Sequence, residues 1–400
     1  MYVVTRTFFK NSKMKLRHFR CLWGAIKATD GDLARSPHLN MNTLFPVLKR
    51  LGYDGVELPL KLALATPEFS TLVRESELDV GFIVFTDGPV APGGSVPGLD
   101  NHWIGDAVPS FTVPTEPGET DKNNIVETHV KVFLEQVEAA YSKFDFEPSY
   151  INSHSCKDYF TRDMAVSFFE TALEYFPQVM HETHRKRYLH SPWVARDFVP
   201  HFPELRLVAD LSHWTCVAET DTNDLDLTKV IEDLAPQFYH IHCRVGYDHG
   251  PQVPDPRAPE WLPYMEGHER WWDAIWRAQS KRGQKVSTMM AEHGPPNYQP
   301  TLPYSREPVV HFYLLFSLSV ISQQHQQTTT QASIWDINHW IHLRRQQRFA
   351  ELFGDNNTSS LLPSETQDFE PSTNPGDSVL LSSSLRPVGF RDETYLSSGI

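Results

Sequence analysis

Short runs rich in β-branched and aromatic residues alternate with segments of helical period along most of the chain, and this alternation restricts the fold more than any other feature. Such alternation is typical of repeated βαβ units and a parallel sheet. The predicted strands are Phe19–Gly24, Asp54–Leu58, Leu78–Phe85, Ser149–Ser153, Val179–Glu182, Leu205–Asp210, Phe238–His242 and Lys285–Glu292. The helices predicted between them are Met41–Leu51, Pro67–Glu77, Asn123–Phe144, Arg162–Phe176, Leu225–Leu234 and His268–Lys281.

Eight strands with interleaved helices favour an α/β fold of the closed (β/α)8 TIM barrel type over an open doubly wound sheet. No GxGxxG motif follows the first predicted strand, so the main signal of a dinucleotide-binding fold is missing from the sequence. The length of 400 residues exceeds the roughly 250 that such a barrel needs, which leaves room for extensions.

The extensions differ from the barrel in composition. We predict an N-terminal extension at 1–18, the barrel at 19–354 and a disordered tail at 355–400, where polar residues dominate and little can be buried. Residues 311–332 join an apolar run to a polar Gln/Thr tract and fit no barrel element, so we predict an insertion there. Helical periodicity resumes at Ile334 and supplies the eighth helix.

Two long loops rich in Pro and Gly follow predicted strand ends, Thr86–Thr120 and Gly246–Gly267. In a barrel those ends form the catalytic face, so the loops are candidate lids over a site. The alternative is that they only lengthen the rim.

Charge and cysteine content narrow the partners and the compartment. A formal net charge of −14 disfavours nucleic acid and anionic membranes as partners, since both need clustered Lys and Arg. No uncharged apolar stretch approaches the roughly 20 residues that cross a bilayer. Four cysteines without a CxxC pair predict no disulfide framework and fit a cytoplasmic location. The basic first 29 residues would also suit a mitochondrial presequence, unless the chain starts at Met14.

Acids and a histidine at the ends of four successive predicted strands are the candidate metal ligands. They are Glu182, Asp210, His242 and Glu292. Because strand ends converge on the barrel mouth, this set can encircle one divalent ion, and its oxygen-rich character suits Mn²⁺, Mg²⁺ or Co²⁺ better than a structural zinc, with Zn²⁺ left open. Each residue alone could be an ion-paired strand end, but burying three carboxylates together without a cation costs several kcal/mol each.

A second group of polar residues accompanies the candidate ligands. His154 follows the fourth strand, His213 lies three residues after Asp210, and Arg244 lies two after His242. Neutral imidazoles can hold the hydroxyls of a polyol, and a guanidinium can hold a carboxylate or phosphate, so we predict that all three bind substrate. The alternatives are that His154 is itself a ligand, that His213 supports a ligand, and that Arg244 is a structural ion-pair partner.

Three further histidines are interpreted as packing or supporting residues. His181 alternates with Glu182 and should point away from the mouth. His240 shares the face of His242 one layer deeper in the barrel. His184 lies past the strand end, where the alternation rule no longer applies.

These motifs, in this order, resemble the xylose isomerase-like TIM-barrel superfamily, the sugar phosphate isomerase/epimerase group. The segment GYDGVEL at 52–58 resembles the second strand of that superfamily. The resemblance implies that the four candidates are the metal ligands, that His213 contacts a substrate hydroxyl, and that Arg244 replaces the Lys or Asn common after the ligand histidine.

Members of this superfamily include ketose epimerases, inosose and dehydroshikimate dehydratases, and abasic-site endonucleases, so the fold does not choose the reaction. The endonucleases bind several zinc ions with extra histidines, including one after the third strand and an Asp-x-His after the seventh. Here the third strand ends in Phe85, Thr86 and Asp87, and no Asp-x-His follows the seventh, so a nuclease is disfavoured.

We therefore expect a divalent-metal-dependent isomerase or epimerase of a small sugar or polyhydroxy carbonyl compound, with Glu182 and Glu292 as the catalytic pair that moves a proton through an enediolate. The alternative is a metal-dependent dehydratase, and a third class is a non-catalytic barrel. The expected partner is a small-molecule polyol or sugar, and a homodimer is left open.

Overall fold

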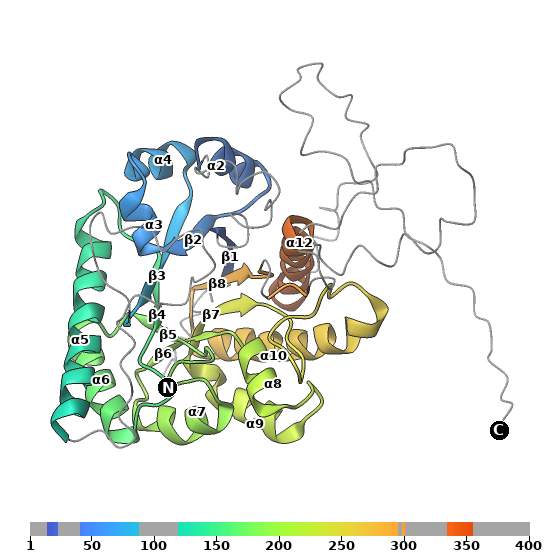
Figure 1. Cartoon of the computed structure of the whole chain (residues 1–400). Coiled ribbons are helices and arrows are strands. Elements are labelled where there is room, and N and C mark those ends of the chain that lie inside the picture. Colours follow the sequence, from blue (N-terminus) through green and yellow to red (C-terminus); the bar gives the residue numbers. More distant parts are fainter. Residues whose placement is uncertain (1–13, 23–40, 88–118, 295–297, 301–333, 355–400) are drawn as a thin grey trace, which may run out of the picture.

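A closed barrel of eight parallel strands, in the order β1-β2-β3-β4-β5-β6-β7-β8, forms the centre of the protein, with helices around its outside (Figure 1). The computed structural model describes residues 14–22, 41–87, 119–294, 298–300 and 334–354. The strands are β1 Lys15–Cys21, β2 Gly55–Pro59, β3 Asp79–Phe85, β4 Tyr150–His154, β5 Met180–Glu182, β6 Arg206–Ala209, β7 Phe238–Cys243 and β8 Val286–Ala291. Pairing of β1 with both β2 and β8 closes the sheet, which confirms the predicted (β/α)8 barrel.

The helices cover the barrel between successive strands (Figure 1). They are α2 Met41–Arg50, α3 Leu60–Ala65, α4 Phe69–Ser76, α5 Glu119–Ser142, α6 Arg162–Tyr175, α7 Pro192–Phe198, α8 Ser212–Ala218, α9 Leu225–Leu234, α10 Leu262–Lys281 and α12 Ile334–Phe353. The sequence did not predict α3, α7 and α8, because six or seven residues are too few to display a helical period. None of the helices in the described ranges is long and apolar enough to cross a bilayer.

The first strand begins four residues before its predicted start, so residues 15–18, which the sequence placed in the N-terminal extension, form part of the barrel. These first residues are mostly charged or polar, so a pattern of apolar residues does not identify them as part of a strand. Arg17 pairs there with Asp54, which directly precedes β2, and with Asp79, the first residue of β3. The predicted insertion at 311–332 and the predicted tail lie outside the described residues.

Of the two loops predicted as lids, the structure describes the second but only the first residues and the last residues of the first. Residues 88–118 of the first loop lie outside the described residues. The second loop is shorter than predicted, because α10 begins at Leu262, whereas the sequence predicted that this helix begins at His268.

Aromatic and aliphatic side chains fill the barrel interior below the mouth. Phe19 and Tyr150 are the largest, with ring centroids 5.0 Å apart. Tyr150 packs where Gly81 of β3 has no side chain, since a Cβ atom there would lie 2.3 Å from the Tyr150 ring. A second, larger apolar core lies between the strands and the surrounding helices. This packing fixes the strands whose carboxyl ends carry the candidate site.

Candidate active site

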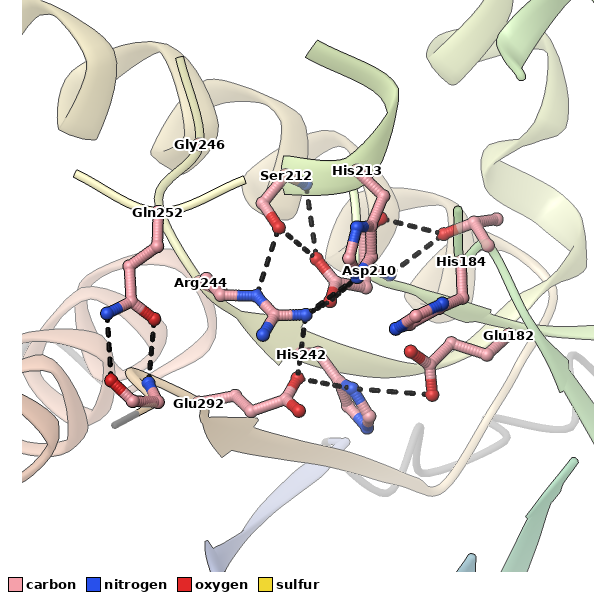
Figure 2. A network of polar contacts seen from close by, with 12 residues as sticks. Glu182, His184, Asp210, Ser212, His213, His242, Arg244, Gly246, Gln252 and Glu292 are labelled. Atoms are coloured by element: carbon pink, nitrogen blue, oxygen red, sulfur yellow. Dashed lines mark hydrogen bonds and ion pairs between the residues drawn. The ribbon is translucent and has the colours of Figure 1, made fainter. Parts of the chain in front are cut away.

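The carboxyl ends of β5 to β8 bring the four predicted ligands together at the barrel mouth. Glu182 ends β5, Asp210 directly follows β6, His242 lies in β7 and Glu292 directly follows β8. All four side chains are buried. Figure 2 shows the His242 ring between the two glutamates, and its Nδ1 lies 2.8 Å from Glu292 Oε2 and 3.8 Å from Glu182 Oε2.

Asp210 is held by the first turn of α8. The backbone N–H and the hydroxyl of Ser212 both donate hydrogen bonds to Asp210 Oδ1, at 3.2 and 2.6 Å. The backbone N–H of Asp210 donates to Thr183 Oγ1 at 3.0 Å, which ties the end of β6 to the end of β5. The other carboxylate oxygen, Oδ2, therefore faces the centre of the mouth.

Arg244 lies within the ligand cluster rather than beside it (Figure 2). Its guanidinium pairs with Asp210 Oδ2, donates to Ser212 Oγ at 3.1 Å and comes within 3.7 Å of Glu292 Oε2. The side chain is 1% exposed. Its role in holding a substrate anion stays a prediction, and in this structure it neutralises candidate metal ligands.

Three imidazoles form a row along the ends of β4, β5 and β6. His154 Nε2 lies 3.0 Å from Glu182 Oε2, and His213 Nε2 lies 3.3 Å from Asp210 Oδ2. His184 stands between them, with its ring centroid 4.7 Å from that of His154 and 3.9 Å from that of His213. The row thus contains both predicted substrate-binding histidines and His184, which the sequence had left outside the site.

The two other histidines lie as the alternation rule predicts. His181 points away from the mouth and packs against Phe133 and Phe169 of the outer helices, with its Nδ1 2.6 Å from Ser155 Oγ. His240 lies one layer below His242 inside the barrel, where its ring centroid lies 4.3 Å from that of Tyr150.

The charges at the mouth shift the pKa values of these groups in opposite directions. Burial raises the pKa of Asp210 to about 6, although Arg244 works against this rise. Burial alone would lower the pKa of His242, but the carboxylates of Glu292, Glu57 and Glu182 outweigh it and raise that pKa well above its ordinary value. Clustered carboxylates thus make the mouth a place that favours a cation.

Two histidines of the row, His184 and His213, in contrast favour the neutral form. Burial lowers the pKa of His184 well below its ordinary value, and the nearby charge of His154 adds to the effect. Burial likewise lowers the pKa of His213, with His184 and Arg244 as further causes. Neutral imidazoles can bind a metal or accept a hydrogen bond from a hydroxyl.

The donor set fits a divalent ion. Ligand atoms of Glu182, Asp210 and His242 all lie within 4.8 Å of one another, and all three residues are buried. His242 Nδ1 and Glu292 Oε2 face one another at 2.8 Å, but neither makes a hydrogen bond of normal geometry to a described residue. Two or three carboxylates with one imidazole match the preferences of Mg²⁺ and Mn²⁺.

Several residues of the mouth were missed by the sequence analysis. Ser212 and Asn152 hold the candidate ligands, and Asn152 donates to Glu182 Oε2 at 2.5 Å. Tyr298 lies between two guanidinium groups, 4.9 Å from Arg185 and 4.6 Å from Arg244. Asn152 precedes His154 by two residues on β4 and so shares its inward face, which is a signal that alternation alone could have supplied.

The sequence and the structure were compared with known proteins. No family model and no curated protein matches the sequence. Matching solved structures include AP endonuclease, family 2, from Brucella melitensis, with 14% identity over 70% of this chain and 93% of that chain and a TM-score of 0.38. They also include the 3-keto-D-glucoside 4-epimerase YcjR from E. coli, with 13% identity over 70% of this chain and 92% of that chain and a TM-score of 0.35.

A third match is the probable 3-DHS dehydratase AsbF from Bacillus anthracis, with 12% identity over 69% of this chain and 92% of that chain and a TM-score of 0.36. At these identities and TM-scores the likeness assigns neither a reaction nor site residues to this chain.

Proposed function

We propose that the protein is a divalent-metal-dependent isomerase or epimerase acting on a small sugar or polyhydroxy carbonyl compound. One observation carries the proposal: two buried carboxylates, Glu182 and Glu292, flank the His242 ring from strands on either side of it, with Asp210 completing the mouth (Figure 2). A bound divalent ion at this place would polarise a carbonyl and its neighbouring hydroxyl and so acidify the intervening C–H.

The two glutamates supply the proton transfer. One carboxylate removes the proton from the carbon next to the carbonyl, and the other returns a proton from its own side to give the isomer or epimer. Asn152 and His154 hold the Glu182 carboxylate in place, at 2.5 and 3.0 Å. Glu292 Oε2 lies 2.8 Å from His242 Nδ1 and 3.7 Å from the Arg244 guanidinium, so both bases occupy fixed positions.

The remaining polar residues of the mouth bind and orient the substrate. His154 and His213 come from opposite ends of the imidazole row, so they can contact hydroxyls at two places along a polyol chain. We expect a small polyol or sugar to lie along this row.

The test is turnover of a substrate panel by the metal-loaded protein. Ketoses, their phosphates, inososes and dehydroshikimate are incubated in deuterated water with Mn²⁺, Mg²⁺ or Co²⁺, and products are identified by mass and chromatography. An isomerase or epimerase conserves the mass apart from incorporated deuterium. We expect Glu292→Gln to lower turnover by about 100-fold or more, as loss of a general base does. Glu266→Gln, at an exposed position on α10, is the matched control.

Other outcomes would overturn the proposal. Loss of one water from the substrate, abolished by Glu292→Gln, would identify the dehydratase instead. Unchanged turnover in Glu292→Gln would remove this residue from the mechanism. A metal-loaded protein that turns over nothing on the panel would favour the non-catalytic barrel.

A further inference from the structure

A buried carboxylate inside the barrel takes no part in the proposed function. Glu57 lies on β2 and is completely buried. Its Oε2 lies 3.4 Å from His242 Nε2 and 3.6 Å from His240 Nε2. Burying a carboxylate costs several kcal/mol unless it is paired or hydrogen-bonded, so its place beneath the mouth requires an explanation.

The two nitrogens of the His242 ring face different carboxylates. Nδ1 faces the mouth, 2.8 Å from Glu292 and 3.8 Å from Glu182. Nε2 faces the barrel interior and meets Glu57 in a hydrogen bond of 3.4 Å. The ring therefore joins the layer of candidate metal ligands to the layer below it.

His240 makes its hydrogen bond to a different residue, so it does not compete with His242 for the Glu57 carboxylate. The Nδ1 of His240 lies 2.7 Å from Thr288 Oγ1 on β8, so that ring is already held by its neighbouring strand. Its Nε2 approaches Glu57 only at 3.6 Å and makes no hydrogen bond of normal geometry to a described residue. Among the described residues, His242 both makes a hydrogen bond to Glu57 and turns its other ring nitrogen toward the mouth.

An imidazole that binds a metal through one nitrogen keeps its proton on the other. A carboxylate that accepts this N–H fixes the tautomer and the ring orientation, and it makes the ligating nitrogen more basic. His242 has this arrangement, because its Nδ1 faces the mouth and its Nε2 meets the Glu57 carboxylate.

We infer that Glu57 is a positioning residue for the metal centre: its carboxylate accepts the Nε2–H of His242 and so presents Nδ1 to the ion. This inference rests on the proposed function, because it assigns a role at the same metal site. The competing explanation is that Glu57 only completes the packing of the barrel interior, and in that case its replacement changes stability and leaves metal affinity alone.

The test compares ion affinity between variants. Glu57→Gln keeps the shape of the side chain and removes its charge, and Glu57→Met also removes the acceptor. Metal-free proteins are titrated with Mn²⁺ by calorimetry and by the electron paramagnetic resonance of the free ion. We expect Glu57→Gln to weaken Mn²⁺ binding by about 10-fold and Glu57→Met by more, as loss of a partner of a ligand histidine does.

A second readout follows the ring itself. In Zn²⁺-loaded protein labelled with ¹⁵N-histidine, the Nε2–H of His242 should be slow to exchange in the wild type and faster in both variants. Asp273→Asn is the control for loss of a buried carboxylate elsewhere, because Asp273 pairs with Arg345 at 2.6 Å between α10 and α12. We expect it to lower the melting temperature without changing Mn²⁺ affinity.

The outcomes separate this inference from the proposed function. Wild-type affinity in both Glu57 variants, with the wild type itself binding an ion, overturns the role of Glu57 and leaves the metal centre standing. A wild type that binds no ion overturns both. If Glu57→Met fails to fold, Glu57→Gln alone decides.

Discussion

Adding a divalent ion to the metal-free protein should raise its melting temperature, because the mouth concentrates buried carboxylates whose oxygens can hold the ion. Glu182, Asp210 and Glu292 are at most 8% exposed. Among the described residues, Arg244 and His242 supply the positive charge that opposes them. An ion that binds only the folded state shifts unfolding toward higher temperature by mass action.

The size of the shift follows from linkage. At a free ion concentration about 1,000 times the dissociation constant, binding adds about 4 kcal/mol to the free energy of unfolding. For a domain of this size about 1 kcal/mol corresponds to about 2–4 °C, so the expected rise is about 8–16 °C. In Asp210→Asn a 10-fold weaker site removes about 1.4 kcal/mol of this gain at the same ion concentration. The rise should then be smaller by about 3–6 °C.

The assay is differential scanning calorimetry of protein stripped with a chelator and then supplied with Mn²⁺, Mg²⁺ or Co²⁺ at one fixed concentration. Each variant is compared with its own metal-free form, so that a change in intrinsic stability cancels. Asp233→Asn is the control, since this exposed residue pairs with Lys229 on α9, away from the mouth. The reasoning is refuted if no divalent ion shifts the wild type, or if Asp210→Asn shows the full wild-type rise.

Three further predictions concern stability. Burial alone would raise the pKa of Asp87, but Arg187 and Lys157 outweigh it and lower that pKa, so its stabilisation is present at neutral pH and is lost as the pH falls below about 4. In denaturant titrations at several pH values, Asp87→Asn should therefore lose less stability than the wild type between roughly pH 7 and pH 3, where the Asp87 carboxylate becomes protonated. Arg345→Leu should cost about 2 kcal/mol in the same assay, because it removes a fully buried guanidinium that pairs with both Asp273 and Glu269, while Arg348 and Arg344 still pair with these carboxylates; a loss below about 0.5 kcal/mol would contradict this. Deleting 355–400 should leave the melting temperature within a few degrees, since the sequence offers little there to bury, and a larger fall would show that this segment docks.

The sequence by itself determined the barrel and the ring of candidate ligands. Strand alternation is a local property, so the eight predicted strands agree with the observed ones apart from their bounds. The strand-end rule follows from parallel topology, and it placed Glu182, Asp210 and Glu292 around His242 without any knowledge of side-chain contacts.

Only the tertiary structure decided how these residues are paired. The turn after β5 carries His184 into the imidazole row, because its backbone no longer alternates beyond the strand end. The contact between Arg244 and Asp210 depends on a guanidinium reaching across from β7 to the first residue after β6. Neither direction is encoded in a local period.

Glu57 is the clearest case. In the sequence it is one acid within an apolar strand segment, and its partner His242 lies 185 residues further along the chain. Both side chains point into the same interior, and they meet only because closure of the barrel brings β2 and β7 to opposite sides of one narrow core. Contacts of that kind depend on the diameter and stagger of the closed sheet, which no local pattern of residues specifies.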